Sequence, residues 1–165
     1  MSGYSAAVKT MPQLEFEKEY KEIKHSIGET DRLLRIKSIQ ATISNLTNIL
    51  TKQPLALHFT GHGIENTKEN LGRSYQFRQK EGNFLLFESD DGEAELVSEK
   101  TLGELIDSSK TKLEFVFVAT CHSEFAGRIF LNAGAKHVIC VKQSEAIADL
   151  AVVTFSKIFY QAVCS

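Results

Sequence analysis

The chain has 165 residues, of which 42% are hydrophobic and 24% are charged. This ordinary globular composition excludes a disordered tail, a collagen-like repeat and a coiled coil. The 19 lysines and arginines against 21 aspartates and glutamates give a net charge of −2. That balance argues against nucleic acid or an acidic membrane as the main partner. The length predicts one domain over residues 1–165.

The cysteines predict a reducing compartment. There are three, Cys121, Cys140 and Cys164, and they are spaced neither like a disulfide framework nor like a zinc-binding pair. The first residues show no signal-peptide pattern, and no apolar run approaches the ~20 residues of a membrane helix. We therefore expect a cytoplasmic domain without a membrane partner, and we expect no cofactor and no metal.

The first third of the chain predicts two helices and a strand. A capping-box pattern at Thr10–Gln13 precedes apolar residues at helical spacing over residues 14–27, and Gly28 can end that helix. Alternation over residues 33–38 favours a strand. A second helix over residues 43–50 ends before Pro54.

The middle of the chain predicts a buried strand followed by hairpin strands. The strand covers residues 55–60 and leads into Gly61-His62-Gly63. Hairpin strands are expected at residues 75–78, 84–88 and 93–97, with Asp90-Asp91-Gly92 as the turn between the last two. Ser98 can cap the helix that follows.

The last third alternates strands with helices. A strand over residues 113–120 precedes Cys121, and a helix over residues 124–133 ends near Gly134. Another strand covers residues 137–141. A last helix is expected to present Ala148, Val152, Phe155 and Phe159 on one face. This alternation predicts an α/β fold, a three-layer α/β/α sandwich with a mainly parallel sheet and a β-hairpin insertion.

Two strand ends carry reactive side chains. One expected strand leads into His62 and another into Cys121. In an open parallel sheet, active residues gather beyond the carboxyl ends of the strands, so both should lie at one edge. An imidazole and a helix N-terminus favour the thiolate form of a cysteine, which is the nucleophile, and the imidazole can protonate the leaving amine. The backbone amides of Gly63 and Cys121 could form an oxyanion hole. Taken separately, the cysteine could be a buried apolar residue and the G-H-G an ordinary turn.

The other polar candidates have simpler interpretations. We interpret His58 as a core or orienting histidine and His122 as a structural or pocket-wall residue, and we place both with Ala119 in a substrate pocket. The set His58, His62, Cys121 and His122 matches no common zinc site. Cys140 fits the core. The acidic cluster Glu88, Asp90, Asp91, Glu93 and Glu95 fits a solvated hairpin, with cation binding as the alternative.

The segments LHFTGHG and VFVATCHSEFAGRIFLNAGAKHVICV, together with the hairpin over residues 83–106, resemble the CHAT domain. The resemblance covers roughly residues 10–163. It implies a caspase-hemoglobinase fold, a dyad of His62 and Cys121, an oxyanion hole that includes Gly63, and peptide-bond hydrolysis through an acyl-enzyme. CHAT domains commonly end longer proteins, often after helical repeats. We therefore expect a fragment of a longer protein that takes polypeptide as its substrate.

Two departures from the caspase-like pattern stand out. Metacaspases carry an aspartate two positions before the nucleophile, where this chain has Ala119, which removes that route to basic specificity. The first core strand of the family has only residues 1–10 available, so it should be short or incomplete. The leading hypothesis is a cysteine endopeptidase. The alternatives are a non-catalytic caspase-like scaffold or regulatory module, and a flavodoxin- or receiver-like module, against which the lack of a phosphate loop argues.

Overall fold

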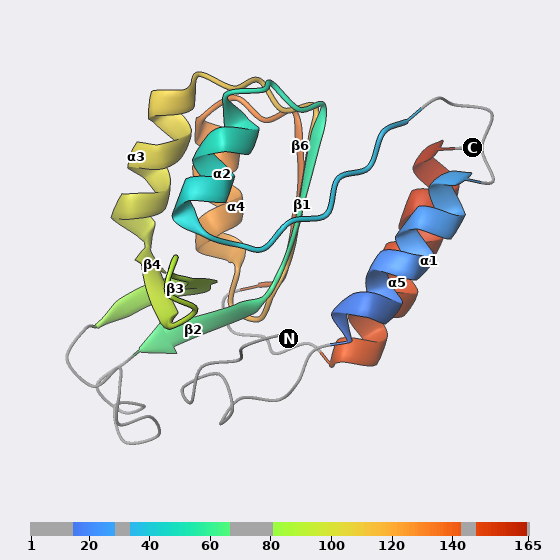
Figure 1. The fold of residues 1–165 in the computed structure, drawn as a ribbon, viewed down its shortest axis with the longest axis horizontal. Coiled ribbons are helices and arrows are strands. Elements are labelled where there is room, and N and C mark those ends of the chain that lie inside the picture. Colours follow the sequence, from blue (N-terminus) through green and yellow to red (C-terminus); the bar gives the residue numbers. More distant parts are fainter. Residues whose placement is uncertain (1–14, 29–33, 67–80, 143–147, 165) are drawn as a thin grey trace. The chain divides into compact units, whose positions relative to one another are not determined.

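A computed structural model describes residues 15–28, 34–66, 81–142 and 148–164 (Figure 1). These residues fall into two compact units. The sheet unit holds the described residues between 40 and 142. The two-helix unit holds residues 15–28, 34–39 and 148–164.

The sheet unit contains the described strands and three helices, with a short connection between most neighbours. In chain order these elements are α2 (Ile43–Leu50), β1 (Ala56–Thr60), β2 (His62–Asn66), β3 (Gly82–Glu88), β4 (Ala94–Ser98), α3 (Glu99–Ser109), β5 (Phe115–Ala119), α4 (Glu124–Asn132) and β6 (His137–Cys140).

A parallel three-stranded sheet in the order β1-β5-β6 forms the centre of the sheet unit. Alternate residues of these strands point to opposite faces. Val116 and Val118 of β5 are fully buried and belong to one core cluster with Leu50 of α2, Leu102 of α3 and Phe130 of α4. The predicted α/β class with parallel strands is therefore confirmed.

The predicted hairpin of β3 and β4 is also confirmed, but it does not stand alone. A second, antiparallel sheet has the order β2-β3-β4, in which His62 of β2 pairs with Leu86 of β3. The sequence did not predict β2. The segment HGIEN lacks the pattern of a half-buried strand, and it is extended because β3 supplies its hydrogen-bonding partner. Figure 1 shows β1 leading directly into β2.

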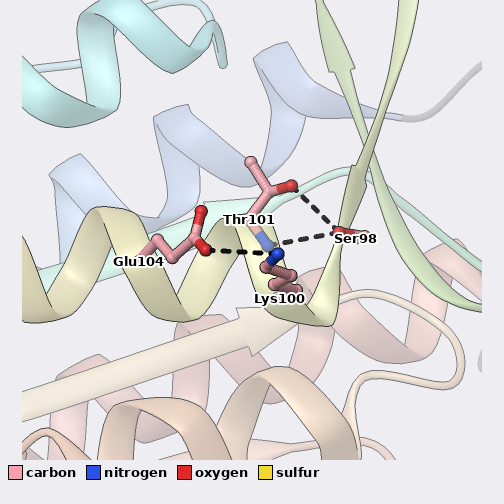
Figure 2. A network of polar contacts seen from close by, with 4 residues as sticks. All are labelled: Ser98, Lys100, Thr101 and Glu104. Atoms are coloured by element: carbon pink, nitrogen blue, oxygen red, sulfur yellow. Dashed lines mark hydrogen bonds and ion pairs between the residues drawn. The ribbon is translucent and has the colours of Figure 1, made fainter.

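Helix ends in the sheet unit follow local side-chain chemistry. Ser98 caps α3, as predicted, because its hydroxyl accepts a hydrogen bond from the backbone N–H of Thr101 at 3.2 Å. Figure 2 shows this cap and the exposed ion pair of Lys100 with Glu104 at 3.8 Å, one helical turn apart. Gly134 follows α4 with a φ of 96°, a left-handed value that ends the helix where expected.

The two-helix unit consists of α1 (Phe16–Gly28) and α5 (Asp149–Cys164), which pack against each other. The buried Ser156 hydroxyl donates to Glu19 Oε1 at 2.7 Å, and Lys157 pairs with Glu22 at 2.8 Å. Gly28 is the last residue of α1, as predicted. Phe155 and Phe159 share one face of α5, as predicted, since their rings stack with centroids 6.1 Å apart, whereas Ala148 precedes the helix. Phe155 is 48% exposed, and the buried Ser156 faces α1.

Other expectations differ from the structure or lie outside it. Residues 34–38 form no strand, although residues 33–38 alternate, because no neighbouring strand pairs with them in the described part of the chain. The expectations for Thr10–Gln13, residues 1–10 and residues 75–78 lie outside the described residues. Across the described helices, none combines the length and the apolar character that crossing a membrane requires.

We predict that Ser98→Ala lowers the free energy of unfolding by about 1 kcal/mol, because the first turn of α3 loses its cap. Urea denaturation measures this change. The matched control is Ser108→Ala, since that exposed hydroxyl donates within α3 to the carbonyl of Leu105, and its effect should stay within about 0.5 kcal/mol. Equal effects of the two variants would contradict the capping role.

Candidate active site

The parallel pairing of β1 with β5 brings the two predicted strand ends to one edge of the sheet. Thr60 of β1 pairs with Ala119 of β5 as the last aligned residues of the two strands. Beyond this edge, β1 leads into Gly61 and His62, and β5 leads into Thr120 and Cys121. The prediction that both segments lie at the same carboxyl edge is therefore confirmed.

The backbone of Gly63 lies directly against the backbone of Cys121. A Cβ atom added to Gly63 would lie 1.8 Å from the Cys121 carbonyl oxygen and 3.0 Å from Oγ1 of Thr120. No other residue type fits this position without movement of the main chain. Glycine is required here by close approach, and the two segments that carry the candidate dyad are in contact through it.

Thr120 fixes the direction of the same carbonyl group. Its side chain is buried, and its hydroxyl donates a hydrogen bond to the Cys121 carbonyl oxygen at 3.2 Å. The carbonyl of Cys121 is therefore held between Thr120 and Gly63. The peptide that follows the candidate nucleophile consequently has a defined orientation.

Ser123 ties the loop after Cys121 to β5 and to the residue that follows β6. Its hydroxyl donates to the carbonyl of Val118 at 3.1 Å and accepts from the amide of Val141 at 3.0 Å, and the side chain is completely buried. Ser123 precedes α4 but makes no side-chain cap to that helix. The hydroxyl is used instead to join the end of β5 to the residue after β6.

His122 adopts a left-handed backbone conformation, with a φ of 50°. Such a conformation costs a residue other than glycine roughly 1–2 kcal/mol. Nδ1 of His122 lies 3.9 Å from Oε2 of Glu65 on β2. The side chain of His122 therefore lies beside β2, the strand that carries His62 and Gly63.

His62 is the first residue of β2 and is half-buried. Cys121 is also half-buried. The proximity of their segments agrees with a dyad. The catalytic roles of His62 and Cys121 stay predictions, as does the oxyanion-hole role of Gly63.

The residues assigned to a substrate pocket lie around the same edge. His58 stacks on Phe117 of β5 with ring centroids 4.6 Å apart, and its Nε2 lies 2.9 Å from Oγ1 of Thr60. Ala119 is buried at the end of β5. His58, Ala119 and His122 therefore all lie near the ends of β1 and β5. Their contact with substrate stays a prediction.

Cys140 differs from Cys121 in its surroundings. It packs against the core cluster, and the Cβ of an alanine at Gly127 would lie 2.6 Å from its sulfur. Burial raises the pKa of the Cys140 thiol, which disfavours the reactive thiolate. Cys140 is half-buried and lies at the margin of the core, so the interpretation of Cys140 as a core residue is confirmed only in part.

The acidic hairpin interacts with the segment before α2 and with α2 itself. Glu88 accepts a hydrogen bond from Gln40, and Asp90 accepts one from Ser44 at 3.4 Å. Within the ranges that the structure describes, no group of three histidine, cysteine or acidic side chains is arranged to hold a metal ion. Nothing in this part of the structure indicates a cation site.

Three supporting residues, Thr120, Ser123 and Glu65, were not predicted from the sequence. Their signal is weak, since a threonine at a strand end and a serine two residues after a cysteine are common. Their roles become visible only through partners that are distant in sequence, such as Val141 for Ser123 and His122 for Glu65.

The sheet unit thus has parallel strands that lead into a histidine segment and a cysteine segment at one edge, the arrangement that the resemblance to caspase-like domains predicts. The family model of the CHAT domain, a caspase-like family, matches residues 6–165. The chain therefore belongs to the CHAT domain family, and the resemblance read from its motifs is confirmed. No curated protein sequence matched the chain.

We predict that Gly63→Ala destabilises the protein by about 1–3 kcal/mol, because the new methyl group would overlap the Cys121 carbonyl. Chemical denaturation measures the effect. The matched control is Gly103→Ala in α3, where the nearest atom would be 4.0 Å from the new Cβ. Since alanine favours a helix over glycine, this control should gain about 0.5–1 kcal/mol. A Gly63→Ala protein as stable as the parent would contradict the close approach.

We also predict that Ser123→Ala costs about 1–3 kcal/mol of folding free energy and speeds hydrogen exchange of the Val141 amide, which loses its acceptor. Thr111→Val is the control, because the buried Thr111 hydroxyl bonds the Leu50 carbonyl at 2.6 Å, away from the site. The control should lower stability without a selective effect on Val141. Unchanged exchange at Val141 in Ser123→Ala would refute the bridging role.

Proposed function

We propose that the chain is a cysteine-type endopeptidase domain that hydrolyses peptide bonds with His62 and Cys121. One observation carries the proposal. The segment that bears His62 lies against the segment that bears Cys121, with the Gly63 and Cys121 backbones in direct contact at the carboxyl edge of two adjacent parallel strands. Membership of a caspase-like family supports the same reaction.

In the first half of the proposed reaction, His62 takes the proton of the Cys121 thiol, and the thiolate sulfur attacks the carbonyl carbon of the scissile peptide bond. The electron pair of the carbon–oxygen double bond moves to the oxygen. When the tetrahedral intermediate collapses, the C–N bond breaks and the imidazolium gives its proton to the leaving amine nitrogen. A thioester between Cys121 and the acyl part of the substrate remains.

In the second half, His62 takes a proton from water, and the hydroxyl oxygen attacks the thioester carbon. The C–S bond then breaks. The sulfur leaves as thiolate or recovers the proton from His62, and the product is a carboxylic acid. The net reaction consumes one water molecule and regenerates the dyad.

The developing oxyanion would be stabilised by the backbone amides of Gly63 and Cys121. The support for this assignment is that Gly63 carries no side chain and that its backbone approaches Cys121 closely. The Thr120 hydroxyl holds the next peptide bond in one orientation, which would limit the motion of the Cys121 backbone. Preorganised donors of this kind typically contribute about 10²–10³ in rate.

Several finer features belong to the same proposal. We propose a three-layer α/β/α sandwich, because the second face of the parallel sheet carries the apolar side chains of Phe115, Phe117 and Ile139, which require cover. We also propose that residues 1–165 form one domain. Its partner would be a polypeptide substrate, its location the cytoplasm, and its setting a longer protein with helical-repeat or other domains.

We predict that the protein cleaves members of a mixed fluorogenic peptide library and that Cys121→Ala abolishes this turnover. His62→Ala should lower kcat/KM by about 10²–10⁴, because the acid–base group is lost. An iodoacetamide probe should label Cys121 more slowly in His62→Ala than in the parent protein.

Cys140→Ala is the matched control, since it removes a cysteine of the same domain that packs against the core. It should leave both turnover and labelling of Cys121 unchanged. Turnover in the parent protein no higher than in Cys121→Ala, measured also in the full-length protein, would refute the peptidase and favour the non-catalytic scaffold.

A further inference from the structure

Glu65 places a carboxylate on the side of β2 that faces the candidate nucleophile. It lies two residues after Gly63, and side chains two residues apart in a strand share a face. The Gly63 position on that face looks directly at the Cys121 carbonyl. The 3.9 Å separation of Glu65 Oε2 from His122 Nδ1 independently places the carboxylate beside the loop that carries Cys121.

The negative charge of the Glu65 carboxylate has a weak countercharge nearby. In the described part of the chain, its ion-pair partner is the His122 imidazole, at a distance longer than a hydrogen bond. Histidine is a weaker countercharge than lysine or arginine at neutral pH. The Glu65 side chain is 33% exposed, so a cation from outside the protein can reach it.

The position of Glu65 along β2 sets where a bound polypeptide would meet it. An extended chain advances about 3.3 Å per residue, so Glu65 lies roughly 7 Å along the strand from Gly63. If Gly63 contacts the scissile carbonyl, the carboxylate lies within reach of side chains one or two residues away. Lysine and arginine would form charge-assisted hydrogen bonds to it, whereas acidic side chains would be repelled.

We propose that Glu65 is a specificity-determining residue that selects polypeptides with a lysine or arginine within two residues of the scissile bond. This inference rests on the proposed peptidase function. The buried Ala119 at the end of β5 brings no charge, whereas Glu65 on β2 places a carboxylate beside the loop that carries Cys121. His122 then serves as the group that the substrate cation displaces from Glu65.

The test compares fluorogenic peptides that differ only in arginine against citrulline, its uncharged analogue, at each of the two positions on either side of the scissile bond. The parent protein should prefer an arginine peptide by about tenfold or more in kcat/KM, the size expected for a charge-assisted hydrogen bond. Glu65→Gln should bring this ratio close to one, and Glu65→Lys should reverse it toward glutamate-containing peptides. The control Glu104→Gln, which changes an exposed carboxylate on α3, should keep the parent ratio.

The outcomes separate this inference from the peptidase proposal. Equal kcat/KM for the arginine and citrulline peptides, or a preference that survives Glu65→Gln, would overturn the role of Glu65 while the peptidase stands. If neither peptide is cleaved, binding of the labelled peptides to the Cys121→Ala protein by fluorescence anisotropy decides. Arginine-selective binding that is lost in Cys121→Ala/Glu65→Gln would support recognition by Glu65 and refute the peptidase. Absence of selective binding would refute both.

Discussion

The parallel register between β1 and β5 is the constraint on which the candidate site depends. The strands align from Ala56 with Phe115 to Thr60 with Ala119, and both chains leave the sheet immediately afterwards. A shift of one residue in this register would turn every side chain of a strand to the opposite face of the sheet. It would also move Gly63 away from the Cys121 carbonyl, because the two segments in contact follow directly after these paired strands.

Buried hydroxyl groups fix the conformation of the loop that follows β5. Thr120 orients the carbonyl of Cys121, and Ser123 connects Val118 with Val141. Each hydroxyl satisfies backbone groups that would otherwise be costly to bury. His122 retains an unfavourable left-handed conformation within this frame. Strain that the surrounding bonds maintain is typical of functional segments, where it fixes the direction of the chain.

Patterns in the sequence predicted the elements whose structure depends on local chemistry or on continuous burial. The apolar run of β5, the hairpin turn between β3 and β4, and the Ser98 cap of α3 were all predictable. Patterns failed where a partner decides. The polar and glycine-containing β2 is a strand because β3 pairs with it, whereas residues 34–38 alternate but pair with nothing in the described chain. Strand formation needs a neighbour, and alternation alone does not identify one.

The sequence by itself determined which reactive residues follow the strands, namely His62 after β1 and Cys121 after β5, and a parallel sheet then required one shared edge. Only the tertiary structure decided that Gly63 touches Cys121 and that Glu65 faces His122. Those contacts join segments more than 50 residues apart in the chain. They follow from the pairing of whole strands and the packing of their loops, and no local periodicity encodes such distances.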